Sequence, residues 1–75
     1  MQPYKDRSGT SGVVAYEIGA GSVTVQFSDG GKYLYDGSAP GAAHVAKMQR
    51  LAVTGDGLNT YINRYVREHY AAKIS

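Results

Sequence analysis

The chain has 75 residues, of which 43% are hydrophobic, and a formal net charge of +2 at pH 7. A chain of this length forms one small domain with a thin core, which leaves little room for a deep substrate pocket. It contains no cysteine, so neither disulfides nor thiolate metal sites support the fold, as is usual in a reducing compartment. The apolar runs are only a few residues long, so we expect no signal peptide, no membrane partner and a cytoplasmic location.

The N-terminal segment differs in composition from the rest of the chain. Residues 1–12 are polar and contain Pro, Gly and Ser, which predicts a flexible tail. Residues 13–75 carry the periodic apolar patterns and are expected to form the single folded domain.

Three β-strands are predicted in the first half of the domain. Residues 13–18 are rich in β-branched and aromatic side chains, and glycines follow at 19 and 21. Residues 22–28 alternate apolar and polar side chains, which is typical of an antiparallel strand with one buried face. The apolar members are Val23, Val25 and Phe27. Asp29-Gly30-Gly31 is a hairpin signal, so residues 32–36 should return as the third strand.

Two helices are predicted in the second half. Ser38 is a suitable N-cap and Pro40 suits the first turn, so a helix is expected over 41–54, with Gly55 ending it. Its apolar stripe is Gly41, Val45, Met48 and Ala52. A second helix is expected over 58–72, with Leu58, Ile62, Tyr65, Val66 and His69 on its apolar side. The predicted fold is therefore α+β: a three-stranded antiparallel β-meander followed by two α-helices packed on one face.

Four stretches form a pattern in chain order: Val14-Ala15-Tyr16-Glu17, Val23-x-Val25-x-Phe27-x-x-Gly30-x-x-Tyr33-x-Tyr35, Ala39-Pro40 and Asn63-x-x-Val66-Arg67-x-x-Tyr70. This pattern resembles that of the KTSC domain family, which is named after a C-terminal module of some lysyl-tRNA synthetases. The family also occurs as small free-standing bacterial and phage proteins. The resemblance implies the same α+β fold, and its synthetase context suggests binding to nucleic acid.

Tyr33 and Tyr35 lie one residue apart on the third predicted strand and therefore share a face. On the face of Phe27 they would be core walls, with their hydroxyls at the rim. On the opposite face they would form an exposed pair able to stack nucleic-acid bases. The core position is favoured because a thin domain with one Phe and no Trp needs large side chains inside.

Polar side chains on the second helix form a candidate site. Asn63, Arg67 and Tyr70 follow i, i+4, i+7 spacing and share one flank, where a guanidinium between an amide and a phenol suits phosphate, carboxylate or a carbonyl edge. The alternative is structural, with Arg67 paired to Glu17 or Asp36. A basic edge of His44, Lys47 and Arg50 on the first helix, with Arg64 and Lys73, suits either a phosphate backbone or a solvated helix face.

Enzymatic function is not expected. His44 and His69 are the only histidines, the carboxylates are scattered, and no triad or P-loop pattern is present, so neither a metal nor another cofactor is predicted. The sequence predicts a small non-enzymatic binding module with RNA or DNA as partner. The contact residues would be Lys47, Arg50, Asn63, Arg64, Arg67 and Tyr70, with Tyr33 and Tyr35 as possible stacking residues. The alternative is a protein–protein adaptor or a homodimerising domain.

Overall fold

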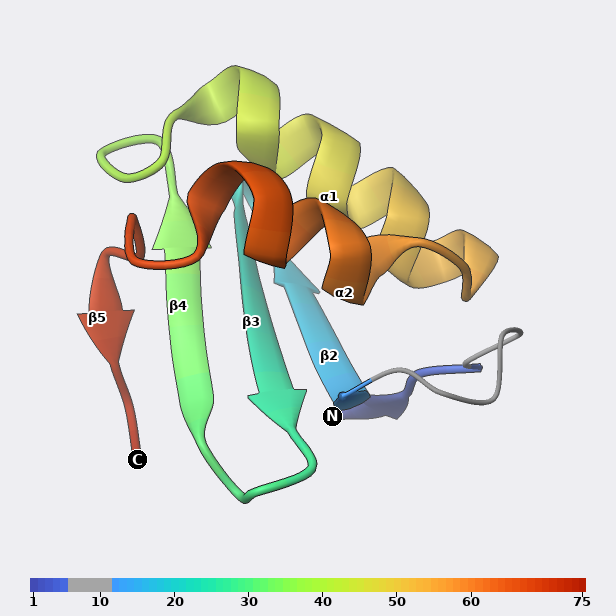
Figure 1. The fold of residues 1–75 in the computed structure, drawn as a ribbon. Helices are drawn as coiled ribbons and strands as arrows, with labels where there is room; N and C mark the ends of the chain where they lie inside the picture. Colours follow the sequence, from blue (N-terminus) through green and yellow to red (C-terminus); the bar gives the residue numbers. More distant parts are fainter. Residues whose placement is uncertain (6–11) are drawn as a thin grey trace.

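The computed structural model describes residues 1–5 and 12–75 and shows one antiparallel sheet with a helical layer on one face (Figure 1). The strands, in both chain and sheet order, are β1 (Gln2–Pro3), β2 (Val13–Gly19), β3 (Ser22–Phe27), β4 (Lys32–Asp36) and β5 (Ala72–Lys73). The helices are α1 (Ala42–Thr54) and α2 (Leu58–Tyr61), which continues into the π-helical turn η1 (Ile62–Val66). The predicted α+β class is confirmed, but the predicted number of strands is wrong, because the described residues form a sheet of five strands.

The three central strands form the predicted meander. Residues directly opposite each other in an antiparallel pair share a face of the sheet. The register places Tyr16 opposite Val25 and Val25 opposite Tyr33, so these side chains all point toward the helices. Tyr35, opposite Val23, lies on the same face. The turn between β3 and β4 has therefore put both tyrosines on the core side.

Two short edge strands complete the sheet. Gln2–Pro3 pairs with β2, and Ala72–Lys73 pairs with β4. Part of the segment 1–12, expected to be a flexible tail, is thus hydrogen-bonded, and Tyr4 behind it is buried; residues 6–11 lie outside the described residues. The sequence did not reveal these strands because two residues are too few to show a periodic pattern.

The first helix forms with the predicted stripe but a different start. Val45, Met48 and Ala52 are buried, and the helix begins at Ala42 after Gly41, whose φ is 115°. The predicted N-cap Ser38 instead donates its hydroxyl and its backbone N–H to the Asp36 carboxylate, at 2.6 and 2.9 Å. Its side chain is therefore engaged in the turn after β4, outside the helix.

The second helix is shorter than the predicted 58–72. Leu58, Ile62 and Val66 form its buried stripe, at uniform spacings of four residues through the wider π turn. Tyr65 and His69, predicted on the apolar side, are exposed. After the helix the chain turns back to the sheet, where the Ala71 N–H donates to the Leu34 carbonyl at 2.7 Å and leads into β5.

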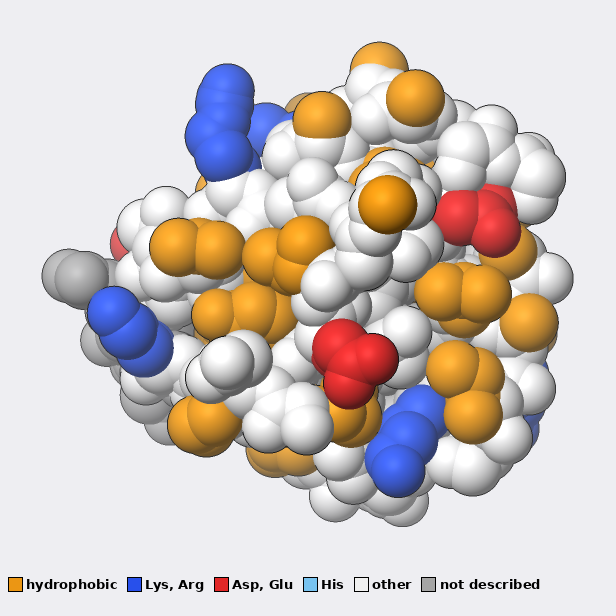
Figure 2. All heavy atoms as spheres, turned by 180° about the vertical axis from the view of Figure 1, so that it is seen from behind, with side chains coloured by type: hydrophobic (Ala, Val, Ile, Leu, Met, Phe, Trp, Pro, Cys, Tyr) orange, Lys and Arg blue, Asp and Glu red, His pale blue; other side chains and the backbone are white. Residues whose placement is uncertain are grey.

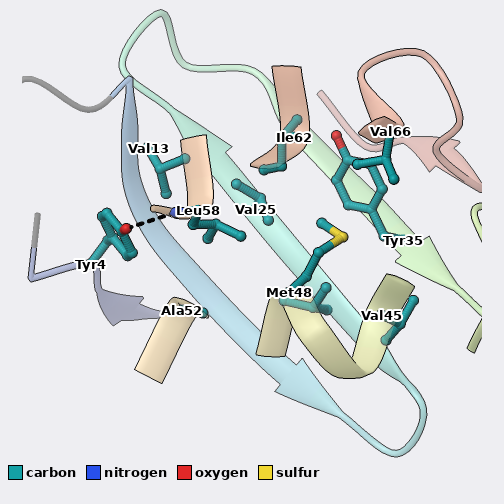
Figure 3. Close-up of a cluster of buried hydrophobic side chains, with 11 residues drawn as sticks. Tyr4, Val13, Val25, Tyr35, Val45, Met48, Ala52, Leu58, Ile62 and Val66 are labelled. Atoms are coloured by element: carbon teal, nitrogen blue, oxygen red, sulfur yellow. Dashed lines mark hydrogen bonds between the residues drawn. The ribbon is translucent and has the colours of Figure 1, made fainter. Parts of the chain in front are cut away.

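The core lies between the sheet and the helical layer (Figure 3). Its buried members are Tyr4, Val13, Val23, Val25, Tyr35, Val45, Met48, Ala52, Leu58, Ile62 and Val66. The other face of the sheet is seen in Figure 2, where hydrophobic side chains form separate clusters between polar atoms and scattered charged groups. No helix in the described part of the chain has the length and hydrophobicity needed to cross a membrane.

Candidate binding surface on the helical layer

A pocket lies between the π-helical end of the second helix and the β3–β4 hairpin, which extends beyond the helical layer in Figure 1. Its volume is about 310 Å³, which is at the small end of the range for ligand pockets. The lining residues are Phe27, Asp29, Tyr33, Tyr35, Ile62, Asn63, Arg67, Glu68 and Tyr70. We call this the tyrosine pocket. It brings together five of the residues proposed from the sequence: Tyr33, Tyr35, Asn63, Arg67 and Tyr70.

Three aromatic rings in contact form one side of the tyrosine pocket. The Phe27 and Tyr33 rings meet edge to face, with centroids 5.6 Å apart and planes at 73°. The Tyr33 and Tyr70 rings are tilted at 55°, with centroids 4.8 Å apart. Such pairs hold aromatic rings in a defined orientation. Lys73 Nζ lies 5.8 Å from the centroid of the Tyr33 ring and adds a positive charge beside this side of the pocket.

Tyr35 forms the base of the pocket and belongs to the core. Its side chain extends from β4 toward Ile62 and Val66 (Figure 3), and only 1% of it is exposed. Its ring faces are therefore unavailable for base stacking, which corrects the stacking role considered for it from the sequence. Burial raises the pKa of its hydroxyl to about 12, with smaller contributions from Tyr33 and Tyr70.

The guanidinium of Arg67 is not held by an internal partner. The expected pairing with Glu17 or Asp36 is absent: the Arg67 side chain is exposed and makes no hydrogen bond or ion pair with residues 1–5 or 12–75. Asp36 instead accepts hydrogen bonds from Ser38, which lower the pKa of the Asp36 carboxyl group. Arg67 therefore retains its donors for an external anion.

The remaining cations proposed from the sequence lie on the outer surface of the helical layer. Lys47, Arg50 and Arg64 are all exposed. At 3.6 residues per turn, Lys47 lies about 60° round α1 from His44, whose ring contacts the second helix, and Arg50 lies about 60° further round in the same direction. Arg64 lies on the second helix between two flanks, one facing α1 and one facing the tyrosine pocket.

A second aromatic cluster joins the two helices, and the sequence reasoning did not identify it as a site. Tyr61 Oη lies 2.7 Å from His44 Nδ1. The Tyr61 and Tyr65 ring centroids are 4.9 Å apart, and the His44 ring is 5.8 Å from Tyr61 and 6.4 Å from Tyr65. We call these three residues the interhelix cluster. The i, i+4 spacing of the two tyrosines is the signal that the sequence offers for this cluster, but the helical periodicity predicts Tyr65 on the buried side.

The interhelix cluster presents one large ring to solvent. Tyr65 is 53% exposed, while Tyr61 and His44 beneath it are half-buried. The Tyr65 ring thus packs against Tyr61 and His44 on its inner side and is accessible to solvent on its outer side. Tyr65 follows Arg64 in the sequence. Its ring contacts the ring of His44 on α1, and Lys47 lies three residues after His44 on that helix.

The described residues contain no group of three or more His, Cys, Asp or Glu side chains that could hold a metal ion.

Comparisons with protein-family models, with curated proteins and with solved structures found no match to this chain.

Proposed function

We propose that this chain is a non-enzymatic module that binds single-stranded nucleic acid across the outer surface of its helical layer. The observation that carries the proposal is the half-exposed ring of Tyr65, which is supported by Tyr61 and His44, on a helical layer whose two helices carry the exposed cations Lys47 and Arg64. An exposed, supported ring next to basic side chains is the combination with which proteins bind unpaired bases and their phosphates.

Stacking would be supplied by Tyr65. A base lying on an aromatic ring contributes about 1–3 kcal/mol to the binding free energy, with little dependence on which base it is. The contacts of Tyr65 with Tyr61 and His44 hold its ring in place before binding. Less conformational entropy is then lost when the base stacks.

Phosphate contacts would come from the exposed cations. Lys47 lies on the α1 side of the interhelix cluster, Arg64 lies in the π-helical turn, and Arg67 directly follows that turn. Arg67 lines the tyrosine pocket, and its guanidinium has no partner among the described residues. Guanidinium groups suit phosphate because they can donate two parallel hydrogen bonds. Arg50 would reach only a strand that bends further over α1.

The proposed function agrees with the nucleic-acid role that the resemblance to the KTSC family suggests, and membership in that family remains a hypothesis. The alternative of a homodimer formed through a sheet edge has less support. Both edge strands, β1 and β5, are only two residues long, and such short edges offer few unpaired backbone groups to another strand.

The test is a titration of the ¹⁵N-labelled protein with a decameric single-stranded RNA and its DNA equivalent at low salt. We expect chemical-shift changes in the amides of Tyr65, Arg64 and Lys47. The wild-type protein should bind the oligonucleotide more tightly than the Tyr65→Ala variant does. The control is Tyr16→Ala, which removes a half-buried tyrosine on a different element, β2. If neither polymer shifts any amide at low salt, the proposed function is wrong.

A further inference from the structure

We infer that the tyrosine pocket receives a single unstacked nucleobase with an exocyclic amino group, such as cytosine, while Arg67 holds the adjoining phosphate. The inference deepens the proposed function and relies on it for the path of the rest of the strand. It is carried by the combination of aromatic walls, a buried phenol, one guanidinium and two carboxylates around one small pocket.

The walls suit a planar ligand. Phe27, Tyr33 and Tyr70 form a continuous aromatic side, and the volume of about 310 Å³ suffices for a ligand of small-molecule size. Unstacked bases are commonly bound against aromatic side chains in this way. The base of the pocket is Tyr35, whose hydroxyl makes no hydrogen bond with the residues that the structure describes. Like any phenol, this hydroxyl is protonated at neutral pH, so it can donate a hydrogen bond to a base carbonyl.

The charges around the pocket favour a ligand with a donor at one end and an anion at another. Arg67, and Lys73 beside the Tyr33 ring, are positive, whereas Asp29 and Glu68 are negative, so a simple anion or a simple cation would each meet charges of its own sign. A nucleotide with an exocyclic amine satisfies both signs, because its phosphate can face Arg67 and its amine can donate to a carboxylate.

Glu68 is the pocket carboxylate that accepts no hydrogen bond at either oxygen from the described residues, whereas one oxygen of Asp29 is engaged. Asp29 Oδ1 already accepts the N–H of Gly31 at 2.8 Å within the hairpin turn. The Glu68 carboxylate accepts no hydrogen bond from the described part of the protein and lies next to Arg67 on the pocket rim. Carboxylates accept from the N4 amine of cytosine, whereas uracil presents a carbonyl oxygen at that position and would be repelled. The pocket should therefore discriminate cytosine from uracil.

The test compares cytidine 5′-monophosphate, uridine 5′-monophosphate and ribose 5-phosphate by amide chemical-shift titration of the intact chain. We expect the cytidine nucleotide to bind about tenfold more tightly than the uridine nucleotide, the size of one good base contact. Shifts should centre on Tyr33, Arg67 and Tyr70. Glu68→Ala should abolish the preference, and the control Glu17→Ala, an exposed carboxylate on β2, should keep it.

Three results would overturn the inference: equal affinity for the two nucleotides, equal affinity for ribose 5-phosphate, or an unchanged preference in Glu68→Ala. The oligonucleotide titration tests the proposed function independently of the nucleotide titration. If oligonucleotides bind in a Tyr65-dependent manner while the nucleotides leave the pocket amides unshifted, the base pocket is wrong and the helical surface stands. If the cytidine nucleotide binds in the pocket and oligonucleotides do not bind at all, the pocket stands as a nucleotide site and the proposed function is wrong.

Discussion

The hydroxyl oxygen of Tyr4 lies 3.2 Å from the backbone nitrogen of Leu58 and accepts its N–H in the buried core, which ties the N-terminal segment to the start of the second helix (Figure 3). The N–H groups in the first turn of a helix have no partner within the helix, so this hydroxyl satisfies a group that folding would otherwise leave without one.

Replacing Tyr4 by Phe should therefore destabilise the protein. The change leaves the buried Leu58 N–H without its acceptor, and we expect a loss of about 1–3 kcal/mol in the free energy of unfolding, measured by urea denaturation. The control is Tyr16→Phe, which removes a hydroxyl that makes no hydrogen bond with residues 1–5 or 12–75 and should change stability by less than about 0.5 kcal/mol. Equal effects of the two substitutions would contradict the role of Tyr4.

Gly55 should not tolerate a side chain. It ends α1 with φ at 80°, and a Cβ built there would lie 2.5 Å from the Cβ of Lys5. The left-handed conformation alone costs a non-glycine residue about 1–2 kcal/mol, and the contact with Lys5 adds to this. We expect Gly55→Ala to lower the free energy of unfolding by about 2 kcal/mol or more. Gly37→Ala, at a glycine with open space around its Cβ, is the matched substitution and should be nearly neutral. A neutral Gly55→Ala would contradict both the left-handed conformation of Gly55 and its close approach to Lys5.

Tyr35 should make stability depend on alkaline pH. Its folded-state pKa is about 12 and its ordinary value is 10.0, so folding favours the protonated hydroxyl. This contribution is fully present below the ordinary value and is lost as pH rises through the folded-state value. At about 1.4 kcal/mol per pKa unit it is on the order of 3 kcal/mol. The free energy of unfolding of wild type should thus fall more steeply between about pH 10 and pH 12 than that of Tyr35→Phe. Parallel curves would contradict the burial of this hydroxyl.

The cations of the helical layer should determine how binding of single-stranded RNA responds to salt. Each phosphate contact on a single strand contributes about 0.7 to the slope of log affinity against log salt concentration. We expect Lys47→Gln and Arg64→Gln each to reduce the slope by about that amount, measured by fluorescence anisotropy at several salt concentrations. Lys32→Gln is the control, because Lys32 pairs with Gln26 and both lie on the sheet face away from the helices. An apolar protein-type interface would instead show no salt dependence in any variant.

Some residues of the candidate site were predicted from their spacing in the sequence, and others reach it only through the fold. The spacing of Asn63, Arg67 and Tyr70 predicts a shared helix flank, and the structure places all three in one pocket although the helix ends at Val66, before Arg67 and Tyr70. The hairpin residues of that pocket, Phe27 and Tyr33, are some thirty or more positions away in sequence. Their approach depends on which face the β3–β4 turn gives to Tyr33, and a shift of one residue would have reversed it.

The sequence by itself determined the central meander, the α1 helix and its end at Gly55. Period-two alternation, a helical apolar stripe and turn glycines act within short windows, and each has a local physical cause. Only the tertiary structure decided the rest. The edge strands exist because β2 and β4 offer backbone hydrogen bonds to segments without a pattern of their own. The exposure of Tyr65 and the missing ion pair of Arg67 depend on how the π-helical end of the second helix lies against α1 and the sheet, which no local pattern encodes.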